Sequence, residues 1–112
     1  MDKSAPLTPA AFHILLALAG GRKHGLGIAD EVEELTGGGT QLGPGTLYRS
    51  LKEMTRSRLI DEASNGDDED PRRRYYTITS GGRAALASEA KRFDELSRLA
   101  RRRGAVSTRA KS

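Results

Sequence analysis

Residues 43–57 read GPGTLYRSLKEMTRS. Gly43 can cap a helix, and Pro44 suits the first helical position, where a missing backbone N–H costs nothing. The spacing predicts a helix over residues 44–57. Three apolar side chains recur at i, i+4 and i+7 and therefore share one face, which we expect to be buried. They are Leu47, Leu51 and Met54.

The remaining faces of this helix are polar and basic. Residues 44–58 hold four basic side chains and one acidic side chain, in a half of the chain that is otherwise acidic. Arginine and lysine contact phosphates or the acceptor edge of guanine, and a tyrosine adds a hydroxyl and a stacking face. On charge alone, a DNA-reading helix and an amphipathic helix with a solvated basic face are equally good interpretations. The candidate DNA-contacting residues here are Thr46, Tyr48, Arg49, Lys52 and Arg56.

Two shorter helices are predicted before this segment. Thr8 and Pro9 suit the N-cap and first position of a helix over residues 9–19, whose apolar residues recur at helical spacing. A second helix is expected over residues 25–35, with an acidic outer face that should not lie against phosphates. His24 precedes it in a turn, and we interpret this residue as a cap of the helix rather than as a proton switch.

A β-hairpin is predicted after the basic helix. Residues 59–63 form a short strand, residues 64–71 a polar connection, and residues 72–79 a second strand rich in strand-forming residues. Three arginines open the second strand and follow an acidic run, so they serve either as a DNA-contacting arm or as one half of an internally neutralised loop. These candidates are Arg72, Arg73 and Arg74. Period-2 alternation turns Arg74 toward the face of Ile78, which favours Arg72 and Arg73 as the DNA contacts.

The last predicted helix spans residues 83–103, after Ser80-Gly81-Gly82. Residues 80–112 carry nine basic and three acidic side chains, and a solvated basic helix and tail is the simplest interpretation of that charge. A helix of about 30 Å exceeds what its own small domain can cover, so we expect its apolar stripe to pair with a second copy. The expected dimer interface is Leu86, Ala90, Phe93, Leu96 and Ala100.

Composition excludes several classes of protein. The chain has 112 residues, which suits one domain, and no cysteine, so disulfides and thiolate chemistry are excluded. Its two histidines are 11 positions apart, and no catalytic set of side chains stands out, so we expect neither an enzyme nor a metal or cofactor site. The longest uncharged run, residues 4–21, is interrupted by prolines and has too short an apolar part to span a membrane. We therefore expect a cytoplasmic protein.

Three helices followed by a hairpin and a long helix are the layout of a winged helix-turn-helix, a mainly α fold of the α+β type. Its third helix would enter the major groove of DNA. We expect residues 1–79 to form the DNA-binding domain with a two-stranded wing. Residues 80–103 would form a dimerisation helix and residues 104–112 a disordered basic tail.

Several sequence blocks occur in order between residues 7 and 99. They are Leu7-Thr8-Pro9, Ile14-Leu15-Leu16-Ala17-Leu18, His24-Gly25-Leu26-Gly27-Ile28, Gly43-Pro44-Gly45-Thr46-Leu47-Tyr48, Leu51, Leu59-Ile60, Arg72-Arg73-Arg74-Tyr75-Tyr76-Thr77-Ile78-Thr79 and Gly82. Together these blocks resemble the PadR family of bacterial transcriptional regulators, in its short class with a single C-terminal helix. The Gly-Thr-Leu-Tyr and Arg-Arg-Tyr-Tyr blocks are specific in combination, whereas either alone would be a weak signal.

The resemblance implies a homodimer that binds double-stranded DNA, usually as a repressor, and whose effectors are often small aromatic or drug-like molecules bound near the dimer interface. In a bacterial cell such a protein would lie on the nucleoid when bound. The runner-up interpretation keeps the fold but makes it a protein-interaction module that uses the basic helix on an acidic partner. Two residues depart from the family pattern. Leu26 replaces an aromatic residue, and Arg58 replaces a glycine, at a cost of roughly 1 kcal/mol if the backbone there is left-handed.

Overall fold

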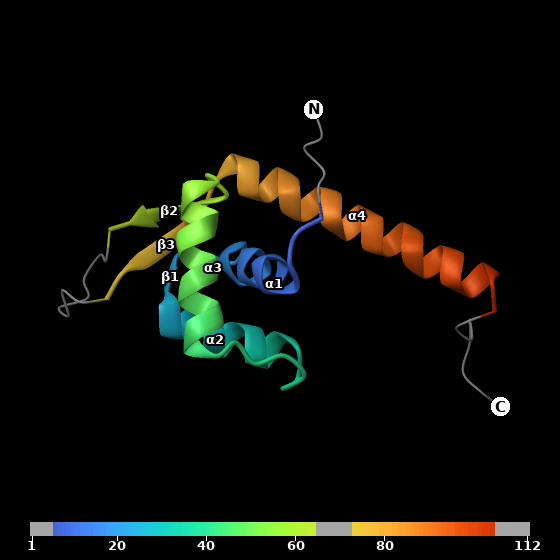
Figure 1. Cartoon of the computed structure of the whole chain (residues 1–112), viewed down its shortest axis with the longest axis horizontal. Coiled ribbons are helices and arrows are strands. Elements are labelled where there is room, and N and C mark those ends of the chain that lie inside the picture. The colour runs from blue at the N-terminus through green and yellow to red at the C-terminus, as the bar shows by residue number, and fades with distance from the viewer. Residues whose placement is uncertain (1–5, 65–72, 105–112) are drawn as a thin grey trace.

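The structure is a computed structural model that describes residues 6–64 and 73–104. Within these ranges the order of elements is α1 (Pro9–Leu18), β1 (Lys23–His24), α2 (Gly25–Leu35), α3 (Pro44–Arg56), β2 (Ile60–Ala63), β3 (Tyr75–Ile78) and α4 (Ser80–Arg102). Figure 1 shows α1, α2 and α3 grouped beside the small sheet, with α4 extending well past them. The fold is a mainly helical winged helix-turn-helix with a long C-terminal helix, as the sequence predicts.

The starts of the first two helices follow the predicted capping chemistry. The Thr8 hydroxyl accepts the Ala11 backbone N–H at 3.0 Å, and Pro9 occupies the first turn of α1. At α2, Nδ1 of His24 accepts the Gly27 N–H at 3.2 Å, which confirms the capping interpretation of this histidine. Each cap satisfies one backbone donor that the helix itself leaves without a partner.

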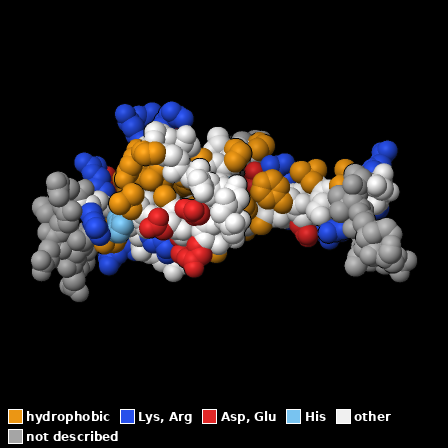
Figure 2. Space-filling view, turned by 90° about the horizontal axis from the view of Figure 1, so that it is seen from below, with side chains coloured by type: hydrophobic (Ala, Val, Ile, Leu, Met, Phe, Trp, Pro, Cys, Tyr) orange, Lys and Arg blue, Asp and Glu red, His pale blue; other side chains and the backbone are white. Residues whose placement is uncertain are grey.

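The outer side of α2 is acidic. Figure 2 views the molecule from below in Figure 1, the side on which α2 lies, and acidic side chains cross the middle of this face. The Lys and Arg side chains in this view gather mainly along the upper edge and toward the two ends. The acidic residues of α2 are Asp30, Glu31, Glu33 and Glu34.

The sheet has three strands where two were predicted. Its order is β1-β3-β2, all antiparallel, and β1 pairs Lys23 with Tyr76 and His24 with Tyr75. The sequence suggested only a turn at β1, because two residues are too few to show any periodicity. The observed β3 also begins later than predicted, at Tyr75, because its pairing with β2 ends there against Ala63. Residue 72 lies outside the described part of the chain.

Helix α4 begins three residues earlier than predicted, at Ser80 rather than Arg83. The Thr79 hydroxyl accepts the Gly82 N–H at 2.9 Å and so caps the helix ahead of the two glycines that suggested a break. Gly82 is buried, and a Cβ there would overlap the Leu59 carbonyl oxygen. The glycine therefore permits α4 to start directly against the chain entering β2.

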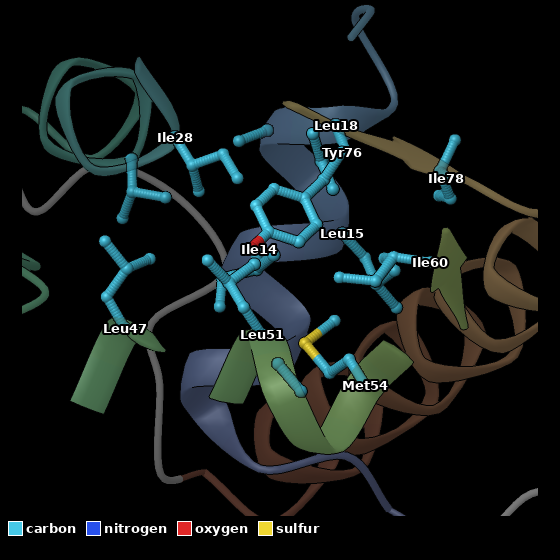
Figure 3. Packing of buried hydrophobic residues seen from close by; sticks show 13 residues of the cluster. Ile14, Leu15, Leu18, Ile28, Leu47, Leu51, Met54, Ile60, Tyr76 and Ile78 are labelled. Carbon is cyan, nitrogen blue, oxygen red and sulfur yellow. The ribbon is translucent and has the colours of Figure 1, made fainter. Parts of the chain in front are cut away.

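The core lies where the three helices meet the sheet (Figure 3). The stripe predicted for α3 is buried, as are Tyr76 and Ile78 of β3, which confirms the predicted alternation on that strand. The largest fully buried side chains come from all three helices and from β2. They are Ile14, Leu15, Leu18, Ile28, Leu47, Leu51, Ile60 and Val32.

Helix α3 ends in a Schellman motif centred on Arg58. The Leu59 N–H donates to the Met54 carbonyl at 2.9 Å, and the Arg58 N–H donates to the Thr55 carbonyl at 3.1 Å. Arg58 has φ 65°, the left-handed conformation that favours glycine. Its departure from the family pattern therefore does fall on a left-handed backbone position.

The first half of α4 packs on α1 and the segment before it. The Phe12 and Phe93 rings meet edge to face at 5.0 Å. Glu89 is buried, with 4% of its surface exposed, and both its oxygens accept hydrogen bonds from Arg92, at 3.1 and 2.8 Å. One of them also accepts the Leu7 N–H at 3.3 Å, so this carboxylate ties α4 to the entry of α1.

Candidate nucleic-acid interface

The basic residues of α3 share the side of the helix that faces away from the core. At about 100° per residue, Arg49, Lys52 and Arg56 fall within an arc of about 60°, centred opposite the buried stripe. All three side chains are exposed. A helix with one basic face directed outward can enter a groove of DNA without disturbing its own packing.

A cavity of about 660 Å³ lies between α3, the start of α2 and the sheet. It brings together four of the predicted DNA-contacting residues, two from α3 and two from the chain entering β3. The cavity is lined by His24, Gly25, Leu26, Tyr48, Lys52, Thr55, Glu62, Arg73, Arg74 and Tyr76. Helix α3 and the chain entering β3 therefore form two walls of one cavity.

Arg74 and Glu62 form an ion pair across the β2–β3 ladder, with 3.0 Å between Nη1 and Oε2. Both side chains are more than half exposed, so the pair contributes only about 0.2–1 kcal/mol. Although alternation places Arg74 on the face of Tyr76, its long side chain reaches solvent. A phosphate arriving at the wing would therefore displace Glu62 from Arg74 at little cost.

Two tyrosines approach each other across this cavity. Burial raises the pKa of the Tyr76 hydroxyl above its usual 10, and the nearby Glu62 carboxylate raises it further. The hydroxyl therefore stays protonated at neutral pH. Tyr48 is half exposed, and its hydroxyl packs against Gly25, where a Cβ would come within 2.8 Å of Oη.

The other predicted residues of α3 lie elsewhere. Thr46 and Arg49 line a groove of about 370 Å³ on the opposite flank of α3, facing residues 6–11 and shared with Glu53. Arg56 lines neither hollow. The predicted set is thus divided between two flanks of one helix.

His24 is the functional candidate that the sequence did not reveal. Its ring lies in the cavity with Arg73, whose Nη1 is 3.4 Å from His24 Nε2, and it meets the Tyr75 ring edge to face at 5.3 Å. Its place before a helix indicated a cap, but only the pairing of β1 with β3 brings it beside the wing.

Helix α4 presents an apolar stripe beyond its contact with α1. Phe93, Leu96 and Leu99 are 43%, 47% and 42% exposed. The other members of the predicted interface differ in their surroundings: Ala90 is exposed and Ala100 half-buried, while Leu86 is half-buried against the chain's own core.

The described residues contain neither a membrane-spanning helix nor a metal-binding cluster. Among residues 6–64 and 73–104, no helix is both long and apolar enough to cross a membrane. In the same ranges, no group of three or more His, Cys, Asp or Glu side chains is arranged to hold a metal ion.

A winged helix-turn-helix with a basic third helix and an arginine-bearing wing defines a class of DNA-binding protein. Residues 14–88 match the transcriptional regulator PadR-like family. The chain belongs to this family of DNA-binding transcriptional regulators, which are not enzymes.

Solved structures share the fold. A PadR family transcription regulator from Clostridium difficile is 26% identical, with a TM-score of 0.73, over 85% of this chain and 97% of that one. Bacillus subtilis PadR in complex with operator DNA is 23% identical, with a TM-score of 0.63, over 73% of this chain and 46% of that one. Bordetella bronchiseptica BpsR, whose DNA binding is regulated by 6-hydroxynicotinic acid, is 18% identical, with a TM-score of 0.64, over 88% of this chain and 70% of that one.

A curated relative is much longer. The chain is 34% identical over 84 residues to an uncharacterized 37.1 kDa protein in transposon TN4556 of Streptomyces fradiae. The match covers 75% of this chain and 23% of that protein, so the chain spans less than a quarter of its relative's length.

Proposed function

We propose that this protein is a homodimeric, ligand-responsive repressor that acts in the cytoplasm on a pseudo-palindromic operator. The observation that carries the proposal is the joint site of α3 and the wing, in which two helix residues and two wing arginines line one cavity. Bacillus subtilis PadR, which shares the fold, has been solved with operator DNA. The closely matching Clostridium difficile structure supports the same regulatory class.

The DNA-binding domain of this proposal is residues 1–79. Arg49, Lys52 and Arg56 would enter the major groove, since they form the outward arc of α3. On its two flanks, Thr46 and Tyr48 would contact the backbone or base edges beside them. The wing residues Arg72, Arg73 and Arg74 would contact backbone phosphates or the minor groove.

Dimerisation would use α4, within residues 80–103, and would leave residues 104–112 as a basic tail. The exposed apolar stripe continues from Phe93 to Leu96 and Leu99, and the C-terminal part of α4 extends beyond the rest of the domain (Figure 1). A second copy of the same helix is the partner whose apolar stripe matches it in length and spacing. Two-fold symmetry would then place two half-sites about one helical turn, ~34 Å, apart.

Ligand response is supported by BpsR, whose DNA binding responds to 6-hydroxynicotinic acid, a small aromatic molecule. In this chain the Phe12 and Phe93 rings lie together beside the exposed half of α4. A small aromatic effector bound there would touch both the DNA-binding domain and the dimerisation helix. It would thereby alter the distance between the two recognition helices.

The test is fluorescence anisotropy with duplex DNA from immediately upstream of the gene, compared with a scrambled duplex, at several salt concentrations. Affinity should fall steeply with salt, because phosphate contacts release counterions. A preference of about a hundredfold or more for the upstream duplex, within the range typical of specific regulators, supports the proposal. Absence of salt-dependent binding to either duplex would favour the protein-interaction module instead.

A further inference from the structure

A glycine of α2 and a tyrosine of α3 lie in close contact. Gly25 is the first residue of α2 and is buried, whereas Tyr48 of α3 is half exposed. A Cβ placed on Gly25 would lie 2.8 Å from the Tyr48 hydroxyl oxygen, 3.0 Å from Cε1 and 3.2 Å from Cζ. The end of the tyrosine ring therefore occupies the space that a side chain at position 25 would need.

The core fixes the backbone on both sides of this contact. Leu47, the neighbour of Tyr48, is buried, and so is Ile28, three residues after Gly25. A closely packed interior cannot admit an extra methyl group between two such helices without strain. The tyrosine ring, which is partly in solvent, is the part of the contact that can move.

The backbone itself does not require glycine at position 25. Gly25 lies in a helix and its φ is not positive, so an alanine could adopt the same conformation. Gly27 is the other glycine of α2, and a Cβ there would meet only ordinary contacts at 3.6 Å or more. The close approach of the tyrosine ring is what distinguishes Gly25 from Gly27.

We propose that Gly25 is a positioning residue, which holds Tyr48 in the place from which it contacts DNA. This inference rests on the proposed function, in which Tyr48 contacts the DNA backbone or base edges. A methyl group at position 25 would have to move the hydroxyl oxygen from 2.8 Å to at least 3.4 Å, where ordinary contact begins. That displacement reaches the tolerance of about 0.5 Å within which binding groups must be held.

Gly25→Ala tests this role by fluorescence anisotropy with the upstream duplex. Binding should weaken by about tenfold, the effect of losing one hydrogen bond to a charged group such as a phosphate. The thermal midpoint should stay near that of the wild type, because the half-exposed ring can turn toward solvent. Gly27→Ala is the matched control: it adds the same methyl group to the same helix and should leave both affinity and midpoint unchanged.

A double-mutant cycle shows whether the effect passes through the tyrosine. Tyr48→Ala should weaken binding by about tenfold or more. Adding Gly25→Ala to that variant should cause no further loss, because no ring remains to be displaced. The same loss in both backgrounds would overturn the positioning role, and so would wild-type affinity in Gly25→Ala alone.

Proton NMR without DNA observes the contact itself. The chain has three tyrosines, so the ring resonances of Tyr48 are assigned by their absence from the spectrum of Tyr48→Ala. The wild type should show a nuclear Overhauser effect between the Gly25 Hα protons and the Tyr48 ring. Gly25→Ala should shift the Tyr48 ring resonances more than Gly27→Ala does. Absence of the Overhauser effect, or equal shifts in the two variants, would overturn the inference.

Arg49→Gln separates failure of this inference from failure of the proposed function. Weaker binding by Arg49→Gln, with wild-type affinity in Tyr48→Ala and Gly25→Ala, would overturn the positioning role and still uphold DNA binding by α3. Wild-type affinity in all three variants would overturn DNA binding by α3 as well.

Discussion

Arg58 has φ 65°, and it is the only residue other than glycine with a positive φ in the part of the chain that the structure describes. It occupies the position of the Schellman motif that glycine normally holds, between the end of α3 and Leu59. A side chain with a Cβ costs about 1–2 kcal/mol in this conformation. Ordering a glycine on folding costs about 0.5–1 kcal/mol more conformational entropy than ordering another residue, because glycine has more freedom in the unfolded chain. Arg58→Gly should therefore stabilise the fold by about 0.5–1 kcal/mol.

The assay is thermal and urea unfolding followed by circular dichroism at one fixed protein concentration, since dimerisation makes the midpoint concentration-dependent. At about 4–8 °C per kcal/mol for a small domain, the midpoint should rise by about 2–8 °C. The urea midpoint should rise with an unchanged slope. Arg58→Ala is the matched control, because it removes the same charge but keeps the Cβ. A midpoint for glycine at or below that of the wild type, or an equal gain for alanine, would refute the backbone explanation.

The remaining predictions concern α4. Gly82→Ala should destabilise the fold by about 1–3 kcal/mol, because the added Cβ would overpack against the Leu59 carbonyl. Gly81→Ala is the control and should not destabilise the fold, because its Cβ would meet only ordinary contacts at 3.6 Å. Equal thermal midpoints for the two variants would contradict the close approach of Gly82 to Leu59. Arg92 lowers the pKa of Glu89 below its usual 4.5, so the carboxylate stabilises the fold above about pH 4.5, and that contribution is lost as pH falls through the lowered pKa. Glu89→Gln should therefore show a weaker fall in thermal midpoint between pH 7 and pH 3, and an unchanged pH profile would show that the carboxylate contributes nothing. Phe93→Asp should give monomers by light scattering, and a persistent dimer would remove the proposed interface.

Much of the fold follows from local patterns. Residues 25–35 form a helix with the predicted bounds, and the α3 stripe is buried, because helical periodicity over ten or more residues is a strong signal. The start of α4 was missed because two glycines resemble a break, whereas the Thr79 hydroxyl caps the helix ahead of them. Strand β1 was missed because two residues carry no pattern, and their strand character depends on a partner some fifty positions away.

The arrangement of the candidate site was also predictable only in part, because it depends on contacts between residues that are far apart in sequence. Residue type and helical spacing predict that α3 is the DNA-facing helix, but spacing along one element does not show which residues lie beside each flank. The structure places Tyr48 toward the wing and Arg49 toward the segment before α1. His24 lies beside the wing, in contact with Arg73, which is 49 residues away in sequence. No local pattern indicates a contact of that range.

The outward arc of α3, formed by Arg49, Lys52 and Arg56, is the surface proposed to contact the operator. The direct measurement is the dissociation constant of Arg49→Ala and of Lys52→Ala for the upstream duplex, with thermal midpoints measured alongside. Each substitution should weaken binding by about tenfold or more, with the midpoint nearly unchanged because both side chains are exposed. Wild-type affinity in both variants would show that another surface of the molecule docks on DNA.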